Sequence, residues 1–300
     1  MKENHDRREF LQFATAGAAA LVAGPALGAE RPKARKQQPA PGAGARRRPL
    51  PFELGLASYT LRKFDLAKTL DMTNRVGLKH IALKDFHLAM NSSPEQIRDT
   101  VAKVKEAGLT LYGGGVIYMR DEAQVNQAFD YAKAAGMGVI IGVPQPPLLA
   151  LVEKKVKEYD IKVAIHNHGP GDKVYPVPAT IIEKIKDLDP RIGLCNDIGH
   201  TIRAGVDPAA SLEEFADRLI DVHIKDVTSA DAKGGAIEVG RGVINIPQVI
   251  RTLARINFTG IVSFEYEKSE NDPLPGLAES VGYVRGVMAA VMPQGSEGGR

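Results

Sequence analysis

Eight short apolar runs, separated by amphipathic segments, constrain the fold of this chain more than any other feature of its sequence. The runs lie at 52–58, 79–84, 109–114, 138–143, 162–167, 191–197, 219–225 and 260–265. The helical pattern between them is illustrated by 94–107, where Ile97, Val101 and Val104 fall on one face and Gly108 follows. Strands alternating with helices form parallel sheets, and eight such units predict a single closed (β/α)8 TIM barrel of the α/β class. An open doubly wound sheet is the weaker alternative, because no Gly-rich phosphate loop follows the first run.

The direction of each strand side chain follows from the apolar residues beside it. In 162–168, Val163 and Ile165 are bulky and apolar and should face the helices, which turns Ala164, His166 and His168 into the barrel. The same alternation in the last three runs predicts inward positions for Gly193, Cys195, Asp197, Asp221, His223, Lys225, Ser263, Glu265 and Glu267. Active sites of TIM barrels lie at the carboxyl ends of the strands, where the polar members of this set are expected.

Two imidazoles and two carboxylates therefore converge on one rim. His166, Asp197, His223 and Glu265 come from four consecutive strands and form a mixed nitrogen and oxygen donor set. Such a set predicts one divalent metal ion and favours Mn²⁺, Zn²⁺, Co²⁺ or Fe²⁺ over Ca²⁺ or Mg²⁺, which prefer oxygen. The pattern leaves two alternatives open, since His168 is inward like His166, and Glu267 is inward like Glu265.

The order of these motifs resembles a known family. HNHGP, CNDIGH, DVHIKD and SFEYE follow one another on the last four strands, as in the xylose-isomerase-like sugar phosphate isomerase/epimerase family. The resemblance covers about residues 52–290. It implies one divalent metal held by a carboxylate on the fifth strand and by residues matching Asp197, His223 and Glu265. It also implies a substrate contact for His200, and Lys225 and Asp226 match the family's His-x-Lys-Asp.

One position departs from the family pattern, because His166 stands where a glutamate is usual. The family's epimerases are expected to use two metal-bound carboxylates, one on each side of the substrate carbon. A metal-bound imidazole has no free basic lone pair toward the substrate, so Glu265 remains the one obvious base. We therefore expect a metal-dependent, isomerase/epimerase-like enzyme that deprotonates carbon beside a sugar carbonyl. The alternatives are a carbon–oxygen lyase or hydrolase acting on 3-keto-glycosides and a non-catalytic sugar-binding barrel.

Several polar residues are expected to assist at the rim. Lys225 and His200, together with Lys84 at the end of the second run, are candidate catalytic groups. The candidates for contacts with sugar hydroxyls are Tyr59, Arg62, His87, His168 and Arg241. His80, near the start of its strand, and the inward Cys195 are expected to be structural.

The charge distribution restricts the partners. Residues 51–300 carry 29 Lys and Arg against 32 Asp and Glu, so the net positive charge of the chain belongs to residues 1–50. A mildly acidic domain does not favour nucleic acid, which needs clustered positive charge, and we expect a small carbohydrate as partner. A three-metal endonuclease would also need more His and Glu. The single cysteine excludes an intramolecular disulfide, and a homo-oligomer is compatible with the sequence.

The first 29 residues have the features of a twin-arginine signal peptide. Arg7 and Arg8 precede a weakly apolar, Ala-rich stretch that ends in small residues near Ala29. Residues 30–50 are rich in Pro, Ala and Arg and read as a disordered linker, followed by a catalytic domain over 51–292 and a disordered tail over 293–300. We therefore expect export to the periplasm and no stable membrane insertion after cleavage.

Replacing Arg7 and Arg8 together by lysine should abolish export, because the paired arginines are the expected recognition element. The measurement is the fraction of mature protein outside the cytoplasm, with a lysine replacement of Arg46 and Arg47 as a charge-matched control. Unchanged export of the Arg7/Arg8 variant would contradict the assignment.

Overall fold

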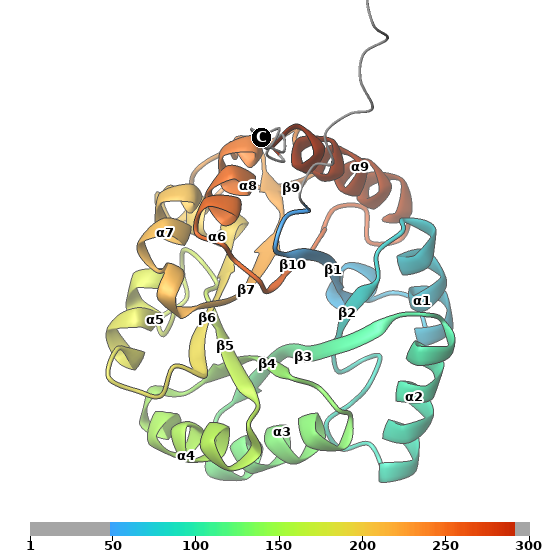
Figure 1. The fold of residues 1–300 in the computed structure, drawn as a ribbon, viewed down its shortest axis with the longest axis vertical. Coiled ribbons are helices and arrows are strands. Elements are labelled where there is room, and N and C mark those ends of the chain that lie inside the picture. The colour runs from blue at the N-terminus through green and yellow to red at the C-terminus, as the bar shows by residue number, and fades with distance from the viewer. Residues whose placement is uncertain (1–48, 292–300) are drawn as a thin grey trace, which may run out of the picture. The chain divides into compact units, whose positions relative to one another are not determined.

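The computed structural model describes residues 49–291, and the expected signal peptide, nearly all of the linker and the tail lie outside them. Eight parallel strands close into a barrel in the order β1-β10-β7-β6-β5-β4-β3-β2 (Figure 1). Each expected apolar run forms one strand, which confirms the (β/α)8 barrel. The strands are β1 Glu53–Ala57, β2 His80–Leu83, β3 Thr110–Met119, β4 Val139–Pro144, β5 Lys162–His166, β6 Ile192–Asp197, β7 Leu219–Ile224 and β10 Ile261–Phe264.

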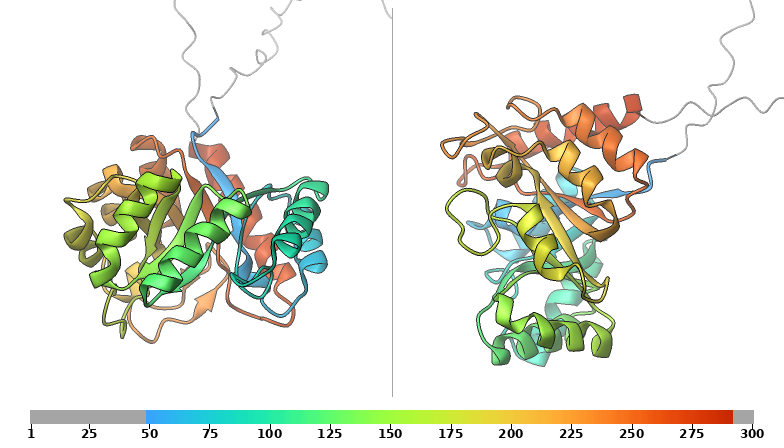
Figure 2. Two further views of the ribbon diagram at one scale, coloured as in Figure 1. Left: turned by 90° about the horizontal axis from the view of Figure 1, so that it is seen from below. Right: turned by 90° about the vertical axis from the view of Figure 1, so that its left-hand side faces the viewer.

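Helices surround the strands on the outside of the barrel (Figure 2). They are α1 Leu66–Arg75, α2 Pro94–Glu106, α3 Glu122–Ala134, α4 Leu149–Tyr159, α5 Pro178–Ile185, α6 Ile198–Arg203, α7 Pro208–Glu214, α8 Ile246–Arg255 and α9 Leu274–Val291. The start of α2 shows how local sequence fixes a boundary, because Ser93 and Gln96 form a capping box around Pro94. Within residues 49–291 there is one helix more than the eight expected, since both α6 and α7 lie between β6 and β7.

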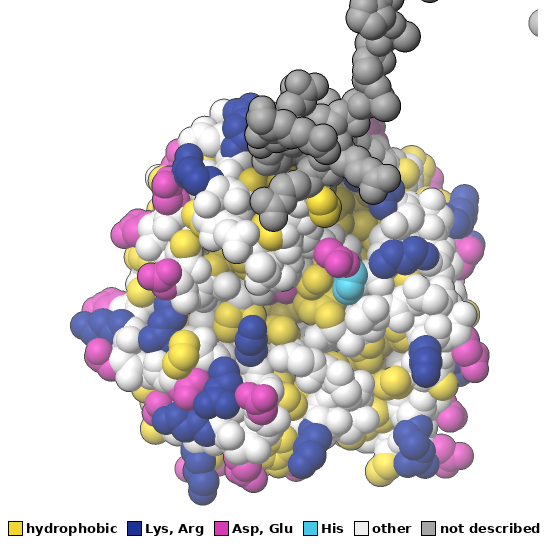
Figure 3. Space-filling view, in the orientation of Figure 1, with side chains coloured by type: hydrophobic (Ala, Val, Ile, Leu, Met, Phe, Trp, Pro, Cys, Tyr) yellow, Lys and Arg dark blue, Asp and Glu magenta, His cyan; other side chains and the backbone are white. Residues whose placement is uncertain are grey.

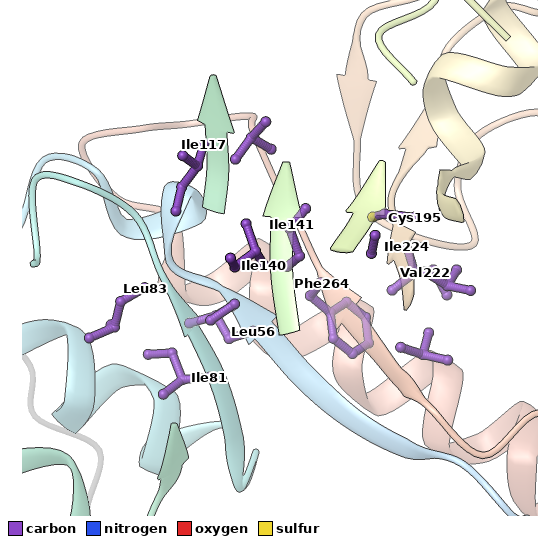
Figure 4. Packing of buried hydrophobic residues seen from close by; sticks show 14 of the residues in the cluster. Leu56, Ile81, Leu83, Ile117, Ile140, Ile141, Cys195, Val222, Ile224 and Phe264 are labelled. Atoms are coloured by element: carbon purple, nitrogen blue, oxygen red, sulfur yellow. The ribbon is translucent and has the colours of Figure 1, made fainter. Parts of the chain in front are cut away.

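The apolar core lies between the strands and the helices. Leu56, Ile81, Ile140, Val222 and Phe264 are fully buried there and come from five strands (Figure 4). The strand register places Ile140 beside Val163 and Ile165 beside Leu194, so their side chains share the outer face of the sheet. The outward positions expected from the sequence are therefore correct.

The inner face of the barrel is polar in several layers. The hydroxyls of Tyr112 and Ser263 lie 2.5 Å apart, and the Cys195 thiol lies 3.6 Å from Asp221 Oδ1. Burial raises the pKa of the Cys195 thiol, with a further contribution from the Asp221 charge, so the thiol stays protonated. This agrees with the structural role expected for Cys195.

The segment between β7 and α8 is organised by one buried carboxylate. Asp226 opens the short hairpin of β8 Asp226–Val227 and β9 Ala236–Ile237. Its Oδ1 accepts hydrogen bonds from the backbone N–H groups of Val227 (2.9 Å) and Ile244 (3.2 Å). Its Oδ2 accepts from Gly240 and Gly242 at 3.0 Å each. A Cβ on Gly242 would overlap Asp226 Oδ1, so only glycine permits this approach.

The surface offers no large region of one charge on the face shown in Figure 3, where acidic and basic side chains are interspersed around the edge. Among the helices of residues 49–291, none combines the length and apolarity needed to span a bilayer.

Asp226→Asn should lower the free energy of unfolding by about 2–4 kcal/mol, because an amide nitrogen would face backbone N–H donors in a fully buried site. Chemical denaturation measures the change. Asp231→Asn, in the exposed part of the same segment, is the control and should cost less than about 1 kcal/mol. Equal effects of the two substitutions would contradict the role given to Asp226.

Candidate metal centre

The carboxyl ends of β5, β6, β7 and β10 bring four side chains together. His166 Nε2 lies 3.2 Å from His223 Nδ1 and 3.4 Å from Asp197 Oδ2. His223 Nδ1 lies 3.3 Å from Glu265 Oε2. One ligand atom from each of the four residues falls within 4.8 Å of all the others, and all four side chains are buried. The structure thus assembles the quartet that alternation predicted.

The spacing of these atoms fits a small divalent ion. Four ligands placed at about 2.1 Å in tetrahedral geometry lie about 3.4 Å from one another. Three of the six distances among these atoms, 3.2, 3.3 and 3.4 Å, are close to that edge length, and all six lie within 4.8 Å. Two imidazole nitrogens and two carboxylate oxygens are also a donor set that borderline divalent metals accept.

The protonation states of three residues of the quartet, His166, Asp197 and Glu265, favour metal binding. Burial lowers the pKa of His166 to about 4, so its imidazole is neutral and has a lone pair to donate. Burial alone would raise the pKa of Asp197, but the neighbouring His200 and Lys225 hold it well below its usual range. The pKa of Glu265 is likewise lowered, against the effect of burial, by Lys225 and His223. Both carboxylates are therefore ionised near neutral pH.

The pKa of His223 is shifted in the opposite direction to that of His166. Burial lowers its pKa, but the charge of Glu265 and a hydrogen bond to it outweigh that effect, and the pKa is raised. Its second nitrogen, Nε2, points toward Asp221 Oδ1 at 3.8 Å. A carboxylate behind a histidine commonly orients that histidine as a metal ligand. Asp221 therefore lies where it can fix the ring of His223.

Lys225 forms ion pairs with both carboxylates of the quartet. Its buried ammonium lies 2.9 Å from Asp197 Oδ2 and 2.7 Å from Glu265 Oε2, and it also pairs with Glu267. The aliphatic part of Lys225 passes over Gly199, where a Cβ would overlap Lys225 Cγ. The glycine of the CNDIGH motif thus makes room for the lysine.

The structure places both alternatives left open by the sequence, His168 and Glu267, outside the buried quartet. His168 Nε2 lies 3.0 Å from the Tyr118 hydroxyl, and its Nδ1 lies 3.8 Å from Asp172. Glu267 is one-third exposed and pairs with Lys225. Neither residue belongs to the buried quartet, which contains His166 and Glu265.

A cavity of about 210 Å³ opens onto the quartet. Its walls include His166 and Glu265, and also Tyr59, Lys84, Val116, Tyr118, His168, His200 and Glu267. The structure therefore brings most of the expected catalytic and substrate-contacting residues to one cavity. Tyr118, at the end of β3, was missed by the sequence analysis. The available signal was an aromatic residue two positions before the charged Arg120, where the third strand ends and a loop begins.

His87 and Arg241, which were expected to contact substrate, lie outside this cavity. Both ring nitrogens of His87 are engaged inside the protein, Nδ1 at 2.9 Å from Ser58 Oγ and Nε2 at 3.0 Å from Thr69 Oγ1. Arg241 is exposed and forms an ion pair with Glu279 of α9 at 2.5 Å. Neither residue is among those that line the cavity. The sequence placed them on loops at the correct end of strands, but loop direction is a tertiary property.

Arg62 and His80 also have defined partners. Arg62 pairs with Glu270 at 3.0 Å, and its guanidinium lies 4.7 Å from the centre of the Tyr59 ring. It therefore supports a cavity wall and does not itself line the cavity. His80, at the first position of β2, lies 3.1 Å from Glu53, which agrees with a structural role at the opposite end of the barrel.

The fold and the site together define a class of protein. The closed (β/α)8 barrel buries two histidines, an aspartate and a glutamate at the carboxyl ends of its strands, a donor set of the kind that divalent ions accept, beside a cavity. Residues 65–287 match the model of the Xylose isomerase-like TIM barrel family. The chain is a member of that family.

Its relatives include named sugar-modifying proteins. An inosose dehydratase of Clostridium tetani is 28% identical in an alignment of length 152 that covers 44% of this chain and 50% of that protein. The matches span no more than half the length of the curated relatives. The solved structure of a D-tagatose 3-epimerase-like protein has a TM-score of 0.66 at 17% identity, covering 80% of this chain and 98% of that one. A Mycobacterium smegmatis family member, solved in complex with magnesium, has a TM-score of 0.62 at 17% identity over 81% and 98% of the two chains.

Proposed function

We propose that this protein is a metal-dependent enzyme that removes a proton from carbon beside the carbonyl of a sugar or sugar derivative. The observation that carries the proposal is the buried quartet of two imidazoles and two carboxylates at the wall of a cavity. A barrel that only bound sugar would have no use for this arrangement, because buried, mutually close ionisable groups cost free energy. Relatives named as a dehydratase and as epimerase-like support a reaction of this class.

The metal would be held by His166, Asp197, His223 and Glu265, with Asp221 behind His223. When bound, a divalent ion supplies a Lewis acid that makes hydrogen beside a carbonyl easier to remove. The two nitrogen donors favour Mn²⁺, Zn²⁺, Co²⁺ or Fe²⁺. One family member of known structure contains magnesium, which supports a divalent ion in this family but does not identify the metal of this chain.

Glu265 is the proposed base. It is ionised, it lines the cavity, and Lys225 and His223 fix its position. His166 occupies the place where a second carboxylate would allow protonation from the opposite side, and its Nε2 faces the quartet. Glu267 also lines the cavity, but its contact with Lys225 and its partial exposure place it at the edge. One base on one face favours isomerisation or elimination over inversion of a stereocentre.

The other cavity residues would position the substrate. Burial lowers the pKa of His200 to about 4, so this half-buried ring is neutral and can exchange hydrogen bonds with sugar hydroxyls. The Lys84 ammonium donates to the Val116 carbonyl at 2.7 Å and pairs with Asp85 at 3.2 Å, which holds a positive charge at the wall. Tyr59 and His168 complete the polar lining.

Elimination is the second candidate outcome, and it needs one base only, which His166 in place of a second carboxylate leaves available. On a 3-keto-glycoside, Glu265 would take the proton from C2, beside the C3 carbonyl. The electron pair of the C2–H bond would form the C1–C2 double bond while the bond between C1 and the glycosidic oxygen breaks. The leaving oxygen then gains a proton from solvent or a cavity donor, so the products are a free alcohol and an unsaturated keto sugar. The proposed export would suit such a substrate, because phosphorylated sugars are cytoplasmic whereas oxidised glycosides can be encountered outside the cell.

Removal of two quartet members should eliminate the metal. We expect wild-type protein to retain about one divalent ion per chain after dialysis, and the His223→Ala/Asp197→Ala double variant to retain almost none, because two of four ligands are lost. Elemental analysis measures the content. His80→Ala, at the far end of the barrel, is the control. Stoichiometric metal in the double variant would overturn the site.

Glu265→Gln should slow proton removal by about 10²–10⁴-fold, since the amide keeps the shape of the side chain but is not a base. The measurement is solvent deuterium incorporation beside the carbonyl of a ketose, or release of the alcohol from a 3-keto-glucoside, with metal content determined in parallel. Glu267→Gln is the matched comparison and should lose less than about tenfold. A larger loss in Glu267→Gln, with metal retained in both variants, would assign the base to Glu267.

A further inference from the structure

A second cavity adjoins the one that opens onto the quartet. It has a volume of about 200 Å³ and lies where β2 and β3 end. Lys84, Val116 and Tyr118 line both cavities, so these residues form the partition between them. A molecule bound at the quartet would need to extend only past this partition to reach the second space.

Seven of the ten residues that line the second cavity are aliphatic or aromatic. Leu83, Leu88, Met90 and Ile117 provide aliphatic surface, and Tyr131 provides an aromatic ring whose hydroxyl is already donated to the Leu88 carbonyl at 3.1 Å. Three charged residues, Lys84, Asp85 and Arg120, also line this cavity. Lys84 is held by Asp85 and by the Val116 carbonyl, and the Arg120 guanidinium lies 5.3 Å from the centre of the Tyr118 ring. Because these charges have partners within the protein and the other walls are apolar, the cavity favours a ligand portion without charge.

Aromatic side chains mark the same region of the surface. Among residues 49–291 the exposed large apolar side chains are four, and Phe86 and Tyr118 are two of them, at 49% and 39% exposure. The Arg120 guanidinium lies 5.3 Å from the centre of the Tyr118 ring, and the ring centres of Phe86 and Tyr59 lie 6.0 Å apart. Exposed aromatic residues beside a cavity are suited to stacking against a flat ring.

From these observations we propose that the second cavity is an aglycone subsite, and that the substrates are glycosides of planar, uncharged aromatic alcohols. The proposal rests on the proposed function only for the identity of the reacting sugar. The sugar ring occupies the cavity at the quartet, and the group attached at C1 passes Lys84 and Tyr118 into the apolar space. Elimination then releases the aromatic alcohol directly into a pocket separate from the metal ligands.

The subsite is tested by binding alone. Isothermal titration of metal-loaded protein with phenyl β-glucoside and with methyl β-glucoside should show the phenyl compound binding at least about tenfold more tightly, because its ring leaves water for an apolar wall. Met90 is half-buried and lines the second cavity but not the first, so it is the residue to change.

Met90→Trp fills the space and should reduce the preference for phenyl to less than about threefold, whereas Met90→Leu conserves volume and should retain it. Met90→Glu is a second variant, in case the larger side chain disturbs folding, and should reduce the preference through its charge. Equal binding of the two glucosides to wild-type protein, or a full preference in Met90→Trp and Met90→Glu, would overturn the subsite.

Turnover of the 3-keto forms separates this proposal from the proposed function. Release of methanol from the methyl compound, or deuterium incorporation into it, without any preference for phenyl would overturn the subsite and support the function. A phenyl preference in binding with neither alcohol release nor deuterium incorporation from either compound would support the subsite and overturn the function.

Discussion

The buried charges at the carboxyl end of the barrel are the constraint on which the site depends. Asp197 and Glu265 are removed from water, and such carboxylates are tolerated only beside compensating positive groups. Lys225 supplies one ammonium to both, and the quartet leaves two imidazoles facing them. This pairing of Lys225 with both carboxylates explains why position 199 is a glycine, because a side chain there would displace the lysine.

The same polarity determines where the fold obtains its stability. Interiors of TIM barrels are commonly filled by bulky branched residues, but this one contains Tyr112 in contact with Ser263, and Cys195 in contact with Asp221. The apolar layer between strands and helices must therefore supply most of the hydrophobic stabilisation. This separation leaves the inner face free for ionisable groups and gives His223 a carboxylate behind it.

His166 is the residue that most distinguishes the proposed chemistry. It contributes a neutral nitrogen to the quartet, where a carboxylate would add both charge and a second base. In the proposed reaction its presence would restrict proton transfer to the side of Glu265, which favours isomerisation or elimination over inversion. In an elimination, the proposed subsite in the adjoining cavity would receive the leaving group.

The sequence by itself determined the barrel and the quartet, because both follow from periodicity. Outward Val163 and Ile165 fix the inward direction of His166, and the parallel register aligns Asp197 with His223 at one level. Periodicity ends where the strands end. The choice of His166 over His168, the burial of His87 against Ser58 and Thr69, and the turn of Arg241 toward Glu279 all depend on loop paths. Tyr118 reaches the cavity only because β3 extends to Met119, beyond the apolar run that marked it. Loop and strand-end positions are set by contacts between segments far apart in the chain, so only the tertiary structure decided them.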